Sequence, residues 1–123
     1  MDKILYLILL SLVIWILYKQ FVPVKGLHVL TPEQFESEAK RNKVIDVREV
    51  HEYKRGHIKG AVNIPLSQLP QQIDDIPKNC KVLLYCQSGL RSKQAAKLLV
   101  RKGYPNVAEL RGGMMSWKGP TQK

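Results

Sequence analysis

Cysteine is scarce in this sequence, with only Cys80 and Cys86 among 123 residues. If residues 82–85 form an extended strand, a rise of about 3.3 Å per residue separates the two Cα atoms by roughly 20 Å. This exceeds the reach of a disulfide bond, and two cysteines without a CxxC pair or histidine partners form no metal site. We therefore expect two free thiols in a reducing compartment, no bound metal, and a structural role for Cys80.

Acidic and aromatic residues are also few. Ten Asp and Glu stand against twenty Lys and Arg, for a net charge of +10, and only 7% of the residues are aromatic. No basic run alternates with aromatic residues, as a surface for single-stranded nucleic acid requires, so we expect no nucleic-acid partner. Lys93, Lys97 and Arg101, at i, i+4 spacing, are interpreted as a solvated helix face, while the overall charge favours an anionic bilayer surface.

Alanine is missing from the N-terminal part of the chain, where none occurs before Ala39. A secretory signal peptide requires small residues at its cleavage site, so this segment is not interpreted as one. Residues 4–18 are instead apolar on every face, which argues against an amphipathic helix lying in the membrane interface. A buried core helix with such a run would need a larger host domain.

The apolar run at residues 4–18 falls a little short of the ~20 residues that span a bilayer. The flanking lysines can extend to the interface, and Phe21 and Val22 lengthen the apolar stretch. We therefore expect residues 1–22 to form an uncleaved transmembrane helix in contact with membrane lipid. Most of the nearby positive charges follow it, at Lys19, Lys25, Lys40, Arg41 and Lys43. Their position predicts a single-pass cell-membrane protein whose C-terminal domain faces the cytoplasm.

Short apolar runs alternate with helical patterns over the rest of the chain. Strands are predicted at residues 28–30, 44–47, 61–64, 82–85 and 107–110. Helices are predicted at residues 32–41, 66–73 and 92–102, with helical turns at 49–54 and 114–118. This alternation predicts a doubly wound α/β domain with a central parallel sheet, in which ligands bind beyond the carboxyl ends of the strands. We place this domain at residues 28–118, after a linker at 23–27 and before a C-terminal tail at 119–123.

The first helix of this domain is predicted to begin with a capping box, in which Thr31 is the N-cap and Gln34 reaches back to it. Its expected core contacts are Phe35 and Ala39. Pro70 interrupts the helix predicted at residues 66–73.

A cysteine follows the apolar run at residues 82–85, and a glycine-containing loop leads from it to a helix. The loop N–H groups and the positive end of the helix dipole favour an anion here, so they lower the pKa of the Cys86 thiol. Arg91 adds a positive charge nearby. The pattern indicates a nucleophilic thiolate, although a free cysteine after a strand can also be simply a small buried hydrophobic residue.

Asp46 and Arg48 end another predicted strand. A carboxylate is costly to bury unpaired, so we expect Asp46 to bond to loop backbone or to pair with an arginine. Because the carboxyl ends of parallel strands meet at one edge of the sheet, Asp46, Arg48 and Cys86 are expected close together.

Five motifs follow one another along the chain: Asp46-Val47-Arg48; Glu52-Tyr53 with Gly56-His57-Ile58; Gly60-Ala61-Val62-Asn63-Ile64-Pro65; Tyr85-Cys86-Gln87-Ser88-Gly89-Leu90-Arg91-Ser92; and Leu110-Arg111-Gly112-Gly113 with Trp117. In this order they resemble the single-domain rhodaneses over about residues 28–118. The resemblance implies an α/β sulfurtransferase that carries a persulfide on Cys86 and needs no cofactor.

The resemblance also implies roles for the residues around the cysteine. Five residues form the loop that binds the substrate sulfur with its backbone N–H groups: Gln87, Ser88, Gly89, Leu90 and Arg91. Asp46 and Arg48 brace this loop. Ser92 supports it by capping the following helix or by donating to the persulfide.

Four residues separate Cys86 from Arg91, as in the rhodaneses, whereas the related phosphatases and arsenate reductases have five. The tighter ring suits a single sulfur atom better than a tetrahedral oxyanion. His57 is interpreted as part of a structural turn rather than as a general base. Met114, Met115 and Trp117 are expected in the core, and Gly112-Gly113 is expected to serve backbone geometry.

On this interpretation Cys86 attacks the outer sulfur of a donor such as thiosulfate, expels sulfite, and passes the sulfur to a thiol or protein-cysteine acceptor. Two alternatives stay open. The first is a docking or regulatory module for a membrane partner, with incidental turnover. The second is a cysteine phosphatase or arsenate reductase, which the loop length disfavours.

Overall fold

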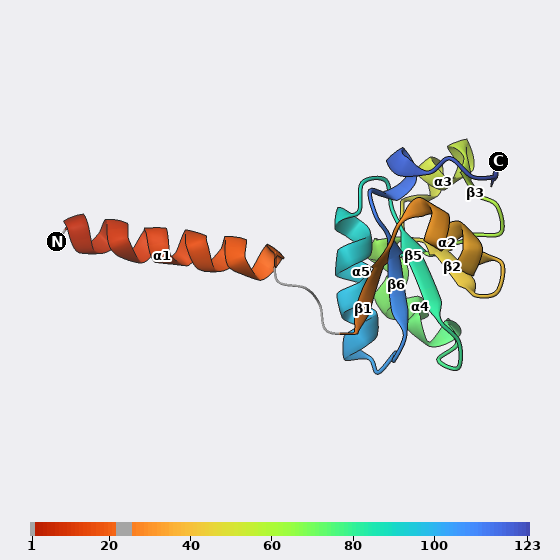
Figure 1. Cartoon of the computed structure of the whole chain (residues 1–123). Coiled ribbons are helices and arrows are strands. Elements are labelled where there is room, and N and C mark those ends of the chain that lie inside the picture. Colours follow the sequence, from red (N-terminus) through yellow and green to blue (C-terminus); the bar gives the residue numbers. More distant parts are fainter. Residues whose placement is uncertain (1, 22–25) are drawn as a thin grey trace.

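The computed structural model describes residues 2–21 and 26–123. Figure 1 shows a long N-terminal helix, α1 (Asp2–Phe21), standing apart from a domain in which helices flank a sheet. The sheet has five strands in the order β1-β6-β5-β2-β4, and every neighbouring pair is parallel. The predicted α/β fold with a central parallel sheet is therefore confirmed.

The strands of this sheet are short and mostly buried. They are β1 (Leu27–Leu30), β2 (Lys43–Asp46), β4 (Val62–Asn63), β5 (Val82–Tyr85) and β6 (Val107–Leu110). All residues of β5 and β6 are buried, as expected where both faces of a parallel sheet are covered. The register pairs Asp46 of β2 with Tyr85 of β5, so the residues that follow these strands emerge at the same edge.

Different helices cover the two faces. Helix α5 (Leu90–Arg101) packs Ala95, Ala96 and Leu99 against one face. Helix α2 (Pro32–Ala39) places Phe35 against the other. The shorter helical elements are α3 (Val50–Arg55), η1 (Leu66–Gln68), α4 (Leu69–Gln72), η2 (Ile73–Asp75) and η3 (Gly113–Ser116).

The start of α2 follows the predicted capping box. The N–H of Gln34 donates to the Thr31 hydroxyl at 3.2 Å, and the N–H of Thr31 donates to the Gln34 side chain at 3.0 Å. The helix ends at Ala39, two residues before its predicted end. Phe35 is fully buried and Ala39 packs against the same cluster, so both predicted core contacts are confirmed.

Proline changes the helix predicted at residues 66–73, which is divided into η1, α4 and η2. Pro70 lies in the first turn of α4, where its missing N–H is tolerated. In the interior of one continuous helix over residues 66–73, the missing N–H would remove a backbone hydrogen bond and the ring would clash with the preceding turn. The helix after the cysteine loop begins at Leu90, two residues before its predicted start.

A second, two-stranded sheet was not predicted. Strand β3 (His57–Ile58) pairs antiparallel with β7 (Thr121–Gln122), so part of a predicted loop meets the predicted C-terminal tail. The N–H of Gly60 also donates to the Gln122 side chain at 2.8 Å. Strands of two residues are too short to show a period-2 pattern, which is why the sequence did not reveal them.

Within residues 2–21 and 26–123, none of the helices has the length and apolar character needed to cross a membrane, so the predicted transmembrane helix at residues 1–22 is wrong. The apolar run at residues 4–18 has 15 residues, about 22 Å at 1.5 Å per residue, against a hydrocarbon core about 30 Å thick. Lys19 does not lengthen it, because its Nζ lies 4.3 Å from the centre of the Trp15 ring, folded against the helix.

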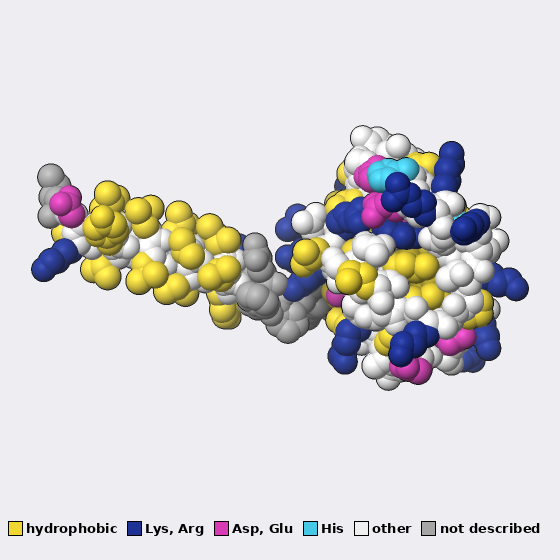
Figure 2. All heavy atoms as spheres, turned by 90° about the horizontal axis from the view of Figure 1, so that it is seen from above, with side chains coloured by type: hydrophobic (Ala, Val, Ile, Leu, Met, Phe, Trp, Pro, Cys, Tyr) yellow, Lys and Arg dark blue, Asp and Glu magenta, His cyan; other side chains and the backbone are white. Residues whose placement is uncertain are grey.

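The predictions that depended on this span are wrong with it. This applies to the single-pass cell-membrane localisation with a cytoplasm-facing domain, and membrane lipid as a partner loses its support. The apolar side chains of α1 are exposed, as Figure 2 shows for one face of the helix. Val22 and residues 23–25 of the predicted linker lie outside the described residues, and Leu27 at the end of that linker already belongs to β1.

Phe35 provides a test of the packing between α2 and the sheet. It has no exposed surface and contacts the rings of Tyr85 and Trp117 edge to face, with centroid distances of 6.3 and 5.9 Å. We expect Phe35→Ala to lower the free energy of unfolding by about 3–5 kcal/mol, because a cavity remains between the layers. Urea denaturation of the full chain measures this change.

The matched control is Met115→Ala, since Met115 is 72% exposed and its truncation should change the free energy of unfolding by less than about 0.5 kcal/mol. A loss below about 1 kcal/mol for Phe35→Ala would contradict the packing described.

Candidate active site

Cys86 lies between the end of β5 at Tyr85 and the start of α5 at Leu90. It has no exposed surface and belongs to the apolar cluster on the α5 face of the sheet. Its Sγ is nevertheless in polar contact, because the N–H of Gly89 donates to it at 3.0 Å and the Ser92 Oγ lies 3.5 Å away. The thiol is therefore more than a small hydrophobic residue: a loop amide donates to it, and it donates to a hydroxyl.

Gly89 places its amide there by its backbone conformation. Its φ of +104° lies in the left-handed region, which side-chain-bearing residues rarely adopt. Gly89 is also the N-cap of the twelve-residue α5, so the thiol lies at the positive end of that helix dipole. The Gly89 N–H and this end of the helix both present positive partial charge to Sγ.

The loop is held from behind by the start of η3. The N–H of Met114 donates to the Cys86 carbonyl at 2.8 Å, and the N–H of Met115 donates to the Gln87 carbonyl at 3.1 Å. Gly113 makes this approach possible, since a Cβ on it would lie 2.5 Å from the Cys86 carbonyl oxygen. The prediction that this glycine pair serves backbone geometry is confirmed.

The side chains of the loop point in different directions. Gln87 is half-buried, whereas Ser88 and Leu90 are exposed, Leu90 by 75%. The exposed pair contributes backbone to the loop rather than side-chain contacts around the thiol.

Asp46 and Arg48 form a buried pair beside the loop. The Arg48 Nη2 donates to the Asp46 Oδ2 at 2.7 Å, and the Arg48 backbone N–H donates to the Oδ1 at 2.9 Å. Asp46 thus has both expected kinds of partner, backbone and arginine. Burial alone would lower the pKa of Arg48, but the hydrogen bonds and charge of Asp46 outweigh it, so this pKa is raised.

Arg48 also connects two segments around the site. Its Nη2 donates to the Gly56 carbonyl at 2.8 Å, and its Nη1 donates to the Gln87 side chain at 3.3 Å. The buried Asp46–Arg48 pair therefore reaches the cysteine loop through the side chain of Gln87.

Arg91 pairs with a carboxylate from another helix. It forms two parallel hydrogen bonds with the Glu52 carboxylate, at 2.6 and 2.9 Å, a partner that the sequence did not indicate. The bonds from Arg91 lower the pKa of Glu52 to about 2, and those to Glu52 raise the pKa of Arg91.

Glu52 and Glu109 are site residues that the sequence reasoning did not assign. Glu109 is a buried carboxylate on β6, and Ser92 donates to its Oε2 at 2.8 Å. A signal was present for Glu109, since it is the single charged residue within an otherwise apolar strand. Glu52 stood in one of the quoted motifs, but its pairing with Arg91 needs the approach of α3 to the loop, which no local pattern shows.

Of the remaining predicted residues, some lie where the sequence placed them and one does not. His57 is buried, stacks on Tyr53 with ring centroids 3.7 Å apart, and shares its Nδ1 with the Tyr53 carbonyl at 3.0 Å, which agrees with a structural turn. Trp117 packs against the core as expected. Met115 is exposed, so its predicted core position is wrong: its place in η3 turns it outward while Met114 faces inward.

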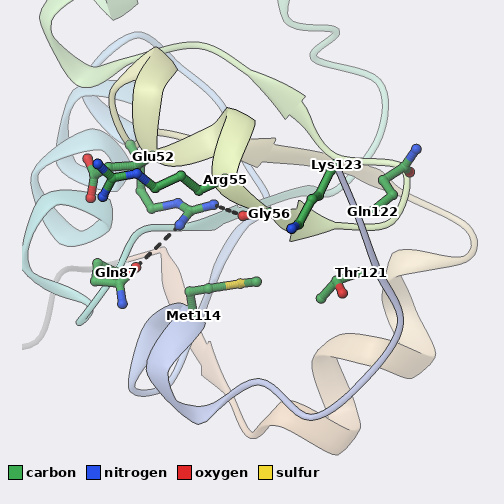
Figure 3. A pocket seen from close by; sticks show the side chains of 9 residues that line it. Glu52, Arg55, Gly56, Gln87, Met114, Thr121, Gln122 and Lys123 are labelled. Carbon is green, nitrogen blue, oxygen red and sulfur yellow. Dashed lines mark hydrogen bonds between the residues drawn. The ribbon is translucent and has the colours of Figure 1, made fainter.

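A cavity of about 610 Å³ adjoins the loop. Figure 3 shows Glu52 and Gln87 on one side of it and the C-terminal residues Thr121, Gln122 and Lys123 on the other. Its lining residues are Arg48, Glu52, Arg55, Gly56, Gln87, Met114, Thr121, Gln122 and Lys123. Three of these are basic, so the cavity favours an anionic ligand. No three His, Cys, Asp or Glu side chains in the described part of the chain are grouped as a metal site.

Comparison with known proteins assigns the family. A model of the rhodanese-like domain matches residues 31–120. The chain is 37% identical over 118 residues to the uncharacterized protein YqhL of Bacillus subtilis, covering 96% of this chain and 94% of that protein. It is 36% identical over 87 residues to the thiosulfate sulfurtransferase GlpE of Coxiella burnetii, covering 70% and 81%.

A solved structure agrees with these relatives. The crystal structure of a rhodanese-related protein from Thermoplasma volcanium matches with a TM-score of 0.73 and 28% identity, covering 77% of this chain and 97% of that one. This chain therefore belongs to the rhodanese-like domain family, and its five-stranded parallel sheet is the sheet of the rhodanese fold.

Gly113 tests how the loop is held. We expect Gly113→Ala to abolish the close approach of η3, because its Cβ would meet backbone atoms of Cys86 and Gln87 and its φ is +63°. The Cys86 thiol should then react with iodoacetamide at a changed rate, measured at pH 7 by mass spectrometry. Gly60→Ala, at a left-handed glycine with open space around it, controls for backbone strain alone. Equal rates in both variants would contradict the support assigned to Gly113.

The Glu52–Arg91 pair predicts a pH dependence. A carboxyl whose pKa is lowered from 4.5 to about 2 stabilises the fold fully above 4.5, and this stability is lost as the pH falls toward 2. We expect Glu52→Gln to remove that part of the acid destabilisation, measured by urea denaturation between pH 5 and pH 2. A Glu52 that titrates near 4.5 in a carbon-13 NMR experiment would contradict the pairing.

Proposed function

We propose that this protein is a rhodanese-type sulfurtransferase that carries sulfane sulfur on Cys86. The observation that supports it best is the polar contact of a buried thiol: the Gly89 N–H donates to Sγ at 3.0 Å in a four-residue loop at the start of α5. This arrangement favours an anionic sulfur, as a nucleophile and a persulfide both require. The named activity of the Coxiella burnetii relative points to thiosulfate as the class of donor.

The first half-reaction transfers the outer sulfur of the donor. The Cys86 thiolate attacks that sulfur, a new S–S bond forms, and the bond to the sulfonate group breaks, so that sulfite leaves with the electron pair. One thiolate and one thiosulfate dianion give one persulfide anion and one sulfite dianion. In the cavity beside the loop, Arg48 and Glu52 are each ion-paired, and the other charged lining residues, Arg55 and Lys123, are basic, which suits a dianionic donor.

The second half-reaction returns the cysteine to its starting state. A thiol or protein-cysteine acceptor, as its thiolate, attacks the outer sulfur of the persulfide and leaves Cys86 as the thiolate. No residue changes its oxidation state over the complete cycle, so the reaction needs no cofactor beyond donor and acceptor.

The other residues support this chemistry at the loop. We expect the backbone N–H groups of residues 87–91 to surround the transferred sulfur, as the Gly89 N–H already contacts Sγ. Asp46 and Arg48 hold the loop through Gln87, and the Ser92 Oγ accepts from the Cys86 thiol. Because Cys86 has no exposed surface, the loop must open far enough to admit one sulfur atom. The loop residues Ser88 and Leu90 are exposed to solvent, so the loop can move outward without disturbing the core.

The buried thiol also favours a second candidate, a docking module that binds a protein partner without turnover. A thiol without exposed surface is compatible with a cysteine that serves packing alone. The two candidates differ in one property, since only the sulfurtransferase acquires a sulfur that cyanide can remove.

The direct test is the release of thiocyanate from thiosulfate and cyanide by the purified full chain. We expect turnover in the wild type and only the background rate in Cys86→Ser, because serine cannot form the persulfide. Cys80→Ser is the matched control, since Cys80 is the other free cysteine and lies outside the loop. Turnover that survives Cys86→Ser would overturn the assignment, and an inactive wild type that still binds a partner would favour docking.

A further inference from the structure

Glu109 is a buried acid that the proposed sulfur transfer does not use. It is 8% exposed and lies on β6, on the face of the sheet covered by α5. Ser92 joins it to the nucleophile: the Ser92 hydroxyl donates to the Glu109 Oε2 at 2.8 Å, and the Cys86 Sγ lies 3.5 Å from the same Oγ. Thiol, hydroxyl and carboxylate thus form a continuous buried row.

The row contains two groups that can become anions, Cys86 and Glu109. Two negative charges separated by one hydroxyl inside a protein repel each other, and burial disfavours each of them. On the neighbouring strands, Leu84 and Val29 stand opposite Glu109 and bring no charge.

The cations near the row come from α5. The positive charge of Lys93 favours the charged form of Glu109. Arg91, near Cys86, donates to the Glu52 carboxylate of α3. Burial nevertheless dominates, and it raises the pKa of Glu109. A carboxyl in this position is therefore able to hold a proton at higher pH than an exposed glutamate.

We propose that Glu109 is a positioning residue for Cys86, and that the two acids share one proton through the Ser92 hydroxyl. The S–H bond breaks and its proton binds the Ser92 Oγ, while the proton of Ser92 passes to the Glu109 Oε2. A thiol and a carboxylate become a thiolate and a neutral carboxyl, with no proton released and no change of oxidation state. This inference rests on the role of Cys86 in the proposed function.

The sharing keeps the row at a single negative charge through the catalytic cycle. When Cys86 is a thiolate or a persulfide anion, the proton stays on Glu109, so between the two titration steps the buried site holds one anion rather than two. The thiolate population then stays constant over a range of pH, because moving the proton within the row does not involve solvent. Coupled acids of this kind titrate in two steps that belong to the pair.

The pH dependence of Cys86 alkylation by iodoacetamide tests this coupling. All variants carry Cys80→Ser, so that a single thiol is measured in the full chain. We expect the rate to rise, level off and rise again with pH. Glu109→Gln keeps the shape and the Ser92 contact but holds no transferable proton, so its rate should rise in a single step. That step should lie at least about one pH unit below the upper step of the parent.

Glu36→Gln is the matched control, because it removes the same charge from α2, away from the cysteine loop. Its profile should keep both steps of the parent. A Glu109→Gln profile that superimposes on the parent would overturn the proposal, leaving Glu109 with a merely structural hydrogen bond.

A reciprocal measurement covers the case in which Glu109→Gln does not fold. Coupling must act equally in both directions, so Cys86 must also shift the titration of Glu109. Carbon-13 NMR of labelled glutamate should show a two-step titration of Glu109 in the parent and a single step in Cys86→Ser. Identical single-step curves in the two proteins would overturn the proposal.

Neither experiment uses a sulfur donor, so the two proposals fail separately. Coupled titrations in a protein that transfers no sulfur would support this inference and contradict the proposed function. Sulfur transfer by a protein with independent titrations would do the reverse.

Discussion

The site depends on one hydrogen bond, from the Gly89 amide to the Cys86 sulfur at 3.0 Å. It exists because the chain turns sharply between a buried strand and a helix, with Gly89 in a left-handed conformation at the turn. The same turn brings the thiol to the positive end of α5. Without it, Cys86 would be one more apolar contact in the cluster beneath that helix.

Three separate parts of the fold hold this turn in place. The start of η3 donates two backbone N–H groups to the carbonyls of Cys86 and Gln87. The buried Asp46–Arg48 pair reaches Gln87 from the end of β2, and the Glu52–Arg91 pair ties the start of α5 to α3. Two carboxylates and two arginines thus neutralise each other around the loop, which leaves the helix dipole and loop amides as the main source of positive potential at the thiol.

Much of this was predictable from the sequence, because it depends on local patterns. Apolar runs of four residues separated by helical segments fix a parallel sheet, and the carboxyl ends of its strands bring Asp46 and Cys86 to one edge. The Thr31 capping box and the glycine pair at the start of η3 were likewise predictable, since each depends on neighbours within a few residues.

The features that the sequence did not reveal depend on contacts between residues far apart in the chain or on very short strands. Arg91 was expected to charge the thiol site, but α3 supplies Glu52 from 39 residues away in the chain. Glu109 is joined to Ser92 across 17 residues, and β3 meets β7 through two residues each. The error at α1 is of another kind: its apolar run predicted a membrane span, but the helix is not long and apolar enough to cross a membrane.

The central claim is that Cys86 carries sulfane sulfur, and mass spectrometry of the full chain treated with thiosulfate tests it most directly. After removal of small molecules and digestion without reductant, we predict that the peptide containing Cys86 has gained the mass of one sulfur atom, which cyanide then removes. A Cys86 peptide that keeps the mass of the free thiol, with sulfur found on Cys80 or nowhere, would contradict the claim.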